Sequence, residues 1–433
     1  MTAASLAAAL KPTRVRLLIL ALLTLGTMIN YLDRTVISIA APTMKEELKL
    51  DPVVMGLVFS AFSWTYAAAQ IPGGIFLDRV GARLTYFFSV TFWSAFTVLQ
   101  GFTMGLTSLL VFRLGLGVAE APCFPANSRI LATWFPQAER ARANSVYSVG
   151  QYFGLGILSP ALYAITAAFG WRALFIGVGA IGLAFGLLWL KSYREPEASK
   201  LVNQAELDLI EAGGGLGQTK KQPAFRWSHL GFLLRQRQIV GASIGQFAGN
   251  AAMVFFLTWF PTYLATERHM AWLKAGFYVM LPFIAASVGV IVGGQLSDFL
   301  LRRTGNATLA RKLPVIAGLL LICTIVGANF VDDNGLVIAC LSVAFFGQGM
   351  VNLGWTLITD VAPKPLMGLT GGVFNLAANL AGIVTPLVIG LIVKETGSFV
   401  YALAFIGVIA LIGAFSYIFI LGPVRRVEFN EAA

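Results

Sequence analysis

Four ionisable side chains lie deep inside long apolar stretches of this 433-residue chain. Two are acids, Asp33 and Glu120, and two are bases, Arg34 and Arg113. A charged residue at the centre of a membrane helix costs about 2.5 to 3.5 kcal/mol on insertion scales. Such residues usually face the interior of a helix bundle and mark a route for ions or substrates. We therefore expect these four residues to carry the function of the chain.

The spacing of these residues predicts how they act. Arg113 and Glu120 are seven residues apart, so a helix places them on one face, whereas the neighbours Asp33 and Arg34 must point in different directions. Arginine has a planar fork that suits a carboxylate, and a carboxylate in a dry cavity can bind a proton near neutral pH. Protonation of Asp33 or Glu120 would then free an arginine for an anionic substrate. Static ion pairs that hold two helices together are the alternative.

The elements that position these residues must be membrane helices. Hydrophobic residues form 57% of the chain and charged residues only 12%, about half the usual share in soluble domains. The apolar runs are long and continuous, which favours helices over an alternating barrel pattern. Cys123, Cys323 and Cys340 lie in apolar runs, which argues against a disulfide framework. His229 and His269 fall outside these runs, so we expect a proton relay built on carboxylates.

The hydropathy pattern predicts an all-α membrane protein with twelve transmembrane helices. The polar stretch 192–238 separates six spans from six others, which predicts an N-terminal bundle (1–191), a cytoplasmic linker (192–238) and a C-terminal bundle (239–433). The predicted spans are 16–41, 53–77, 83–103, 106–127, 143–168, 171–191, 239–265, 274–297, 313–330, 335–359, 366–393 and 399–422.

The basic residues predict the orientation of these spans. With the N-terminus inside, the inner segments hold 23 Lys and Arg residues and the outer loops hold 6. This bias places both termini in the cytoplasm. It also accounts for the net charge of +11 without nucleic-acid binding.

A short pattern recurs in the two halves. Gly74 precedes Asp78, Arg79 and Arg83 after the second span, and Gly294 precedes Asp298 and a pair of arginines after the eighth. The glycine would let two helices approach closely, and a helix end and a basic residue would hold the acid. We interpret the repeat as a reversible cytoplasmic gate formed by Gly74, Asp78, Arg79, Arg83 and Asp298.

This repeat resembles the loop motif of the major facilitator superfamily. The resemblance implies two six-helix bundles that rock around a cavity at the membrane midplane. The stretches Asn30-Tyr-Leu-Asp-Arg34 and Arg113-Leu-Gly-Leu-Gly-Val-Ala-Glu120 are similar to the anion:cation symporter family, and in particular to its bacterial sugar-acid:proton symporters. The resemblance implies that Asp33 and Glu120 couple protons, that Arg34 interacts with these acids and that Arg113 engages the substrate carboxylate.

The resemblance also implies a set of cavity residues. Amides and phenols can hydrogen-bond the hydroxyl groups of a sugar acid, and an indole face can pack on its carbon chain. Ordinary helix packing and interhelical hydrogen bonds are the alternatives. The predicted substrate-binding residues are Tyr31, Arg34, Tyr66, Arg113, Gln151, Asn250, Asn352, Trp355 and Asn375.

Two features depart from what the resemblance to galactonate symporters of this family implies. The segment 249–254 lacks the bulky indole expected there, and Asn250, Asn352 and Asn379 add amides. Galactonate, galactarate, glucarate, a hexuronate or another aldonate therefore stay open as substrates. An organic-anion exchanger or a phthalate-like carrier is the alternative transporter, and a membrane enzyme or sensor is the alternative from another class.

No nucleotide-binding loop and no metal-binding motif occurs in the sequence, so we expect no cofactor, no metal and no enzymatic activity. We expect a monomer in the bacterial inner membrane, with the lipid bilayer, a sugar acid and protons as its partners.

Overall fold

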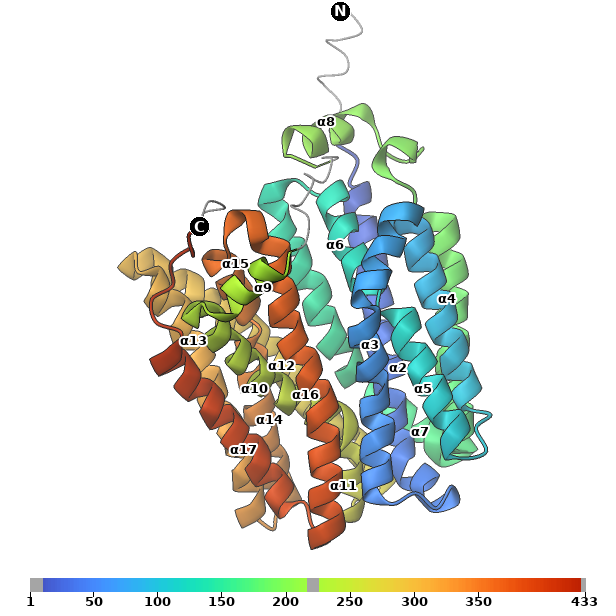
Figure 1. Ribbon diagram of the computed structural model, residues 1–433. Coiled ribbons are helices and arrows are strands. Elements are labelled where there is room, and N and C mark those ends of the chain that lie inside the picture. The colour runs from blue at the N-terminus through green and yellow to red at the C-terminus, as the bar shows by residue number, and fades with distance from the viewer. Residues whose placement is uncertain (1–10, 216–225, 430–433) are drawn as a thin grey trace, which may run out of the picture. The chain divides into compact units, whose positions relative to one another are not determined.

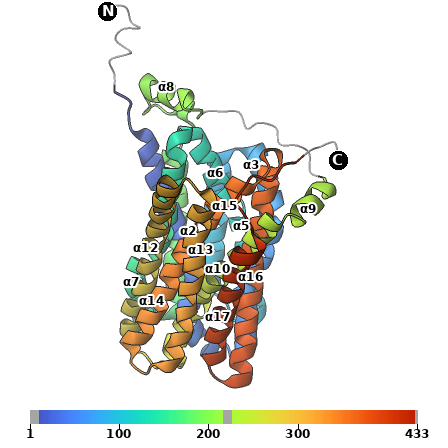
Figure 2. The ribbon, with the colours of Figure 1, turned by 90° about the vertical axis from the view of Figure 1, so that its left-hand side faces the viewer.

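The computed structural model describes residues 11–215 and 226–429, and these ranges contain helices and no strands. Ten of the described helical segments are long and apolar enough to cross a membrane. Figures 1 and 2 show these helices in two views.

The helices of the N-terminal half follow the predicted spans, with three differences. The predicted span 106–127 is two helices that meet at Ala121 and Pro122. The two spans predicted at 143–168 and 171–191 are two helices that follow one another within α7, with a kink at Gly170, whose φ is 78°. The helix at 82–100 is rich in Ser and Thr and is not among the ten apolar segments. The helices are α2 (Val15–Glu47), α3 (Pro52–Val80), α4 (Ala82–Gln100), α5 (Leu106–Glu120), α6 (Cys123–Trp134) and α7 (Gln137–Ser192).

The C-terminal half also follows the predicted spans, and two of them are again interrupted. The span near 239–265 is divided at Trp259, and the span near 335–359 is divided at Asn352 and Leu353. The helices are α10 (Arg237–Thr258), α11 (Phe260–Thr266), α12 (Trp272–Thr304), α13 (Ala307–Ile322), α14 (Asn334–Val351), α15 (Gly354–Val361), α16 (Met367–Thr396) and α17 (Val400–Phe415). The short helices η2 (Cys323–Phe330), η3 (Lys364–Leu366) and η4 (Ser416–Ile420) complete this half.

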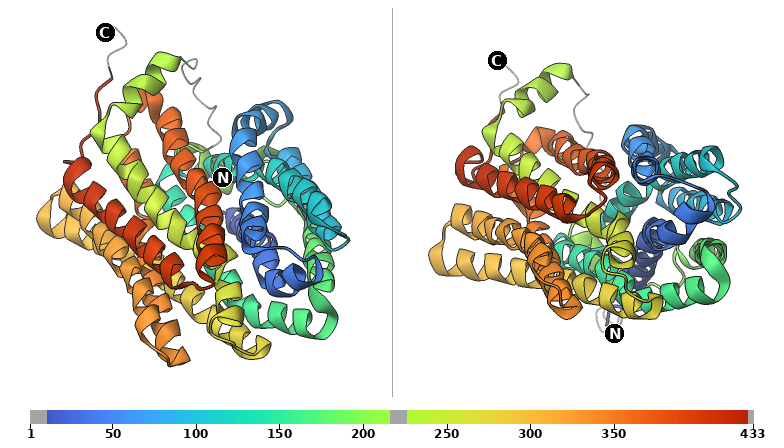
Figure 3. Two further views of the ribbon diagram at one scale, coloured as in Figure 1. Left: turned by 60° about the horizontal axis from the view of Figure 1, so that its bottom comes forward. Right: turned by 90° about the horizontal axis from the view of Figure 1, so that it is seen from below.

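Chain contacts divide the protein into two compact units that cut across the two halves of the sequence. One unit contains the described residues of Met1–Val36, Thr65–Gly154 and Arg172–Lys220. The other contains those of Ile37–Trp64, Leu155–Trp171 and Lys221–Ala433. We call them the first and the second unit. Each has its own helix packing, and Figure 3 shows their helices along a different direction.

Aromatic side chains dominate the core of the first unit. The ring of Tyr86 lies 4.2 Å from that of Trp189, which stacks on Tyr193 at 4.5 Å. Trp93 meets Tyr86 edge to face, so α4 and α7 are joined through a row of buried rings. In the second unit, α12 and α14 pack closely through glycine, because a side chain at Gly289 or Gly349 would collide with the backbone of the other helix.

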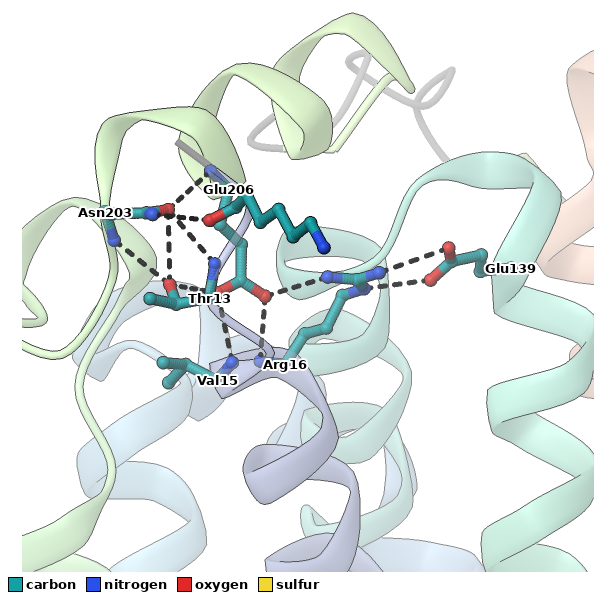
Figure 4. A network of polar contacts seen from close by, with 7 residues as sticks. Thr13, Val15, Arg16, Glu139, Asn203 and Glu206 are labelled. Carbon is teal, nitrogen blue, oxygen red and sulfur yellow. Dashed lines mark hydrogen bonds and ion pairs between the residues drawn. The ribbon is translucent and has the colours of Figure 1, made fainter. Parts of the chain in front are cut away.

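The stretch predicted as a linker, 192–238, contains a short helix, α8 (Gln204–Ala212), that is hydrogen-bonded to the start of α2 (Figure 4). The buried carboxylate of Glu206 accepts hydrogen bonds from the hydroxyl of Thr13 at 2.7 Å and from the backbone N–H of Val15 at 3.0 Å. The backbone N–H and the guanidinium of Arg16 donate to the same carboxylate at 3.2 and 2.9 Å. Asn203 caps α8 and accepts a bond from the Thr13 N–H. Glu206 thus satisfies backbone donors that the first turn of α2 leaves open.

Candidate functional site

An ion pair between α2 and α5 forms the centre of the first unit's charged cluster. The Nε of Arg34 donates a hydrogen bond of 2.7 Å to Oε1 of Glu120, and its Nη2 contacts the same oxygen. The Glu120 side chain is fully buried, and its Oε2 makes no hydrogen bond to the described residues. The arginine therefore satisfies one oxygen of the Glu120 carboxylate and leaves the other without a hydrogen bond from the described residues.

Aromatic rings surround the guanidinium of Arg34. Its Cζ lies 5.1 Å from the ring centre of Tyr31, 5.0 Å from that of Tyr66 and 5.9 Å from that of Phe124. Ring faces stabilise a cation at such distances. The predicted residues Tyr31 and Tyr66 are thus brought together with Arg34, and both are buried.

Asp33 points away from this pair, as the helix geometry requires. Its Oδ2 accepts a hydrogen bond of 2.8 Å from the indole N–H of Trp93 on α4, and both side chains are buried. Asp33 forms no ion pair within residues 11–215 and 226–429, and its Oδ1 makes no hydrogen bond there. The expectation that protonation of Asp33 frees an arginine is therefore wrong, because its partner is a neutral indole. Of the two acids in this cluster, Glu120 is the one that pairs with an arginine among the described residues.

Arg113 lies on the same buried face of α5 as Glu120, as the seven-residue spacing predicts. It is within electrostatic range of both Glu120 and Arg34. Gln151 is buried on α7 in the same unit. The first unit therefore holds both arginines and both acids of the predicted cluster.

The predicted amides of the second unit lie on three helices. Asn250 on α10 donates a hydrogen bond to the backbone oxygen of Ala378 on α16. The backbone oxygen of Asn375 accepts a bond of 2.9 Å from the side chain of Asn379, one turn further along α16. Asn352 is partly buried at the end of α14. Asn250 thus takes part in an interhelical hydrogen bond, the alternative weighed for such amides.

Trp355 belongs to the same predicted set. Its ring meets Phe374 edge to face at 4.9 Å, and its side chain is partly exposed. The ring is therefore held against Phe374, with 39% of the residue exposed.

The predicted gate has other partners than its sequence suggests. Asp78 pairs with Arg129 of α6 at 3.4 Å, while Arg79 is exposed and Arg83 donates to the backbone oxygen of Leu190 at 2.6 Å. The basic residue that holds the acid therefore comes from another helix and not from the motif.

The second copy of the repeat shows the same arrangement. Arg311 of α13 lies 3.8 Å from Asp298 and 2.9 Å from Asp360, so the arginines at 302 and 303 do not hold this acid. The prediction that Gly74 lets two helices approach closely is wrong for this structure. A side chain at Gly74 would meet no atom within 4 Å, whereas one at Gly73 would press against Pro122.

Trp93 and Phe124 are site residues that sequence reasoning missed. Trp93 lies in the one predicted span that is rich in Ser and Thr, and this composition was the available signal that α4 faces a polar interior. Phe124 lies four residues after Glu120 in the predicted span 106–127, a spacing that a continuous helix would bring to the same side. Within the part of the chain that the structure describes, no group of three or more His, Cys, Asp or Glu side chains could hold a metal ion.

Comparison with known proteins identifies the class of this protein. The family model of the Major Facilitator Superfamily matches residues 23–386. The chain belongs to this superfamily, and it is a multi-pass membrane transporter rather than an enzyme. The expected fold class and superfamily are thereby confirmed.

Curated relatives cover nearly the whole chain. It is 44% identical to a probable galactarate/D-glucarate transporter of Escherichia coli K12, over 98% of this chain and 97% of that protein. It is 44% identical to a D-galactonate transporter of Escherichia coli O6:H1, over 97% of this chain and 98% of that protein. A hexuronate transporter of Bacillus subtilis is 31% identical, over 94% and 95%.

A solved structure supports the fold. The bacterial homologue of the human lysosomal transporter Spinster, in an inward-facing and unoccupied conformation, aligns with a TM-score of 0.74. The alignment covers 94% of this chain and 98% of that one at 20% identity, so it speaks for the fold alone.

Proposed function

We propose that this protein takes up a sugar acid together with protons by alternating access. The ion pair between Arg34 and Glu120 is the observation that carries this proposal. An arginine that is held by a carboxylate in a buried, aromatic environment can be offered to a substrate carboxylate when the first carboxylate is neutralised. The relatives named for galactarate, D-glucarate and D-galactonate support the choice of substrate class.

The coupling follows from competition for positive charge. Protonation of Glu120 removes the negative partner of Arg34 and leaves Arg34 and Arg113 with excess positive charge. A sugar-acid carboxylate then restores neutrality, with Arg113 as its main partner. When the proton leaves, Glu120 reclaims Arg34 and the anion is bound less tightly. Asp33 supplies a second proton-binding carboxylate.

The remaining predicted residues have supporting roles in this proposal. Tyr31, Tyr66 and Gln151 in the first unit bind the substrate hydroxyl groups. Their counterparts in the second unit are Asn250, Asn352, Trp355 and Asn375. Gly74, Asp78, Arg79, Arg83 and Asp298 form the cytoplasmic gate.

We place the protein in the bacterial inner membrane as a monomer with both termini in the cytoplasm. The two moving parts are residues 1–191 and 239–433, and residues 192–238 link them. The basic residues of the inner segments support this orientation.

Uptake into proteoliposomes tests the proposal. Radiolabelled galactarate, D-glucarate, D-galactonate and a hexuronate are offered with an inward proton gradient, without one, and with a protonophore. We expect one or more of these acids to accumulate only with the gradient. Accumulation that persists with the protonophore would refute proton coupling. Uptake that requires substrate inside the vesicle would favour the organic-anion exchanger.

A further inference from the structure

The hydrogen bond between Trp93 and Asp33 joins the charged cluster to α4. Trp93 is fully buried, and its only polar atom donates to Oδ2 of Asp33 at 2.8 Å. The backbone around it is well fixed, because the Thr97 hydroxyl donates to the Trp93 carbonyl oxygen at 3.1 Å. The indole ring also packs against Tyr86, at a centroid distance of 6.4 Å. The N–H therefore has a fixed direction.

The two acids of the cluster differ in what they lose on protonation. Glu120 loses an ion pair with Arg34, whereas Asp33 loses only the support of neutral donors, the Trp93 indole at 2.8 Å and the nearby Thr97 hydroxyl. A donor that bonds to a carboxylate stabilises its ionised form. The charged side chain in electrostatic range of Asp33 is that of Glu120, which in turn lies near Arg34 and Arg113. Trp93 thus places an N–H directly on this carboxylate, while the Thr97 hydroxyl is directed to the Trp93 carbonyl oxygen.

We propose that Trp93 is a positioning residue for proton coupling, whose indole N–H orients the Asp33 carboxylate and sets the pH range in which it takes up and releases its proton. The proposal rests on the proposed role of Asp33 in proton-coupled uptake. Without this N–H, Asp33 would hold its proton up to higher pH and release it less readily on the inside.

Trp93→Phe removes the N–H and keeps an aromatic ring. Trp189→Phe is a matched control, because Trp189 is also fully buried, packs on Tyr86 and donates one indole bond, at 3.0 Å to the backbone oxygen of Arg83. Both variants lose one indole hydrogen bond in the same unit. Only Trp93→Phe loses the bond to Asp33.

The readout is the initial rate of sugar-acid uptake into proteoliposomes as a function of pH, at a constant proton gradient. For Trp93→Phe we expect the alkaline limb of the profile to move up by about one pH unit, a tenfold change in proton affinity. For Trp189→Phe we expect the profile of the unaltered protein. Identical profiles for the two variants would overturn the proposal.

An isosteric substitution protects this test against a folding defect. Benzothienylalanine, introduced at position 93 by nonsense suppression, has the shape of tryptophan and no N–H. The same alkaline shift is expected, with elution of the purified protein from size-exclusion chromatography unchanged. An unshifted profile for this correctly folded variant would also overturn the proposal.

Asp33→Asn separates this inference from the proposed function. If Trp93 acts through Asp33, Trp93→Phe should leave proton-independent substrate exchange unchanged in the Asp33→Asn background. A further loss in the double variant would assign Trp93 a packing role. If Asp33→Asn itself accumulates substrate normally, the proposed role of Asp33 fails, whatever the profile of Trp93→Phe.

Discussion

Two buried Arg–Glu pairs in the first unit have nearly the same burial and opposite surroundings. Glu120 and Glu206 are both fully buried, and their partners Arg34 and Arg16 are 15% and 13% exposed. Glu206 receives hydrogen bonds on both oxygens from side chains and from the backbone of α2 (Figure 4). Glu120 receives its arginine on one oxygen, and the other makes no hydrogen bond to the described residues.

The difference shows how a buried charge is assigned to structure or to function. A buried ion contributes reliably to stability only when its remaining lone pairs are also satisfied. Glu206 meets this condition and holds the linker helix α8 on α2. Glu120 does not, so a proton or a change of partner costs less there. We expect Glu206 to matter for stability and Glu120 for coupling.

Glu120→Gln should have the largest effect. The amide keeps the shape of the side chain but cannot exchange a proton, so gradient-driven accumulation should be lost completely. Exchange of labelled for unlabelled substrate should persist, because Arg113 is intact. The measurement is uptake and counterflow in the same proteoliposomes.

Glu206→Gln is the matched control for that variant, since it also neutralises a buried glutamate paired with arginine in the first unit. This variant should still accumulate substrate against the substrate's own concentration gradient when the proton gradient is present. Normal accumulation by Glu120→Gln would contradict the role of Glu120 in coupling. Loss of coupling in a normally folded Glu206→Gln would contradict a purely structural role of Glu206.

Arg113→Lys should have the next largest effect. Lysine keeps the charge but lacks the planar fork for a carboxylate, so we expect apparent substrate affinity to fall by about 10- to 100-fold. The concentration dependence of counterflow measures this change. Arg16→Lys, the same change in the pair that holds α8, should leave the affinity unaltered. Unchanged affinity in Arg113→Lys would remove Arg113 from the substrate site.

Glu206→Ala should have a moderate effect, on stability rather than transport. The change leaves the Arg16 guanidinium and the first N–H groups of α2 without their acceptor, at a cost of about 1 to 3 kcal/mol. We expect the midpoint of thermal unfolding in detergent to fall by about 2 to 5 °C. Glu139→Gln, which breaks the more exposed bond to Arg16 at 3.0 Å, should change the midpoint little. Equal losses in both variants would contradict the special role of Glu206.

The sequence was sufficient for the fold because hydropathy acts over whole helices. All twelve predicted spans correspond to described helical segments, including the two that merge in α7. The chain turns tightly at Gly170, where a glycine readily adopts the positive φ, so two spans follow one another within α7 without a loop. Interruptions such as that at Ala121 and Pro122 follow local backbone details that hydropathy averages over.

The site was predictable in its charges but not in their partners. The order of residues on one helix fixes that Arg113 and Glu120 share a face and that Asp33 and Arg34 diverge. Which side chain meets them depends on the rotation and depth of a second helix. Spacing along one helix carries no information on this, so Trp93 and the gate partner Arg129 appear only in the structure.

An exposed ion pair in the second unit should contribute least to stability, because solvent screens its charges. Asp51 and Lys394 lie 3.2 Å apart with about half of each side chain exposed. The backbone N–H of Val54 and then the Lys394 ammonium lower the pKa of Asp51 below its ordinary value. The stabilisation is therefore present above the unfolded pKa of about 3.9 and is lost as the pH falls through the lower folded value.

Asp51→Asn keeps an oxygen for the Val54 N–H, bonded at 2.8 Å, and removes only the charge. Because solvent screens so exposed a pair, we expect the unfolding midpoint at pH 7 to fall by no more than about 1 °C. That difference from the unaltered protein should shrink as the pH falls through the lowered pKa of Asp51 and vanish below it, where Asp51 is neutral in both states. Thermal unfolding in detergent between about pH 2 and 8 measures both quantities. If Asp51→Asn lowered the unfolding midpoint at pH 7 as much as Glu206→Ala, burial and complete hydrogen bonding would not determine how much an acid contributes to stability.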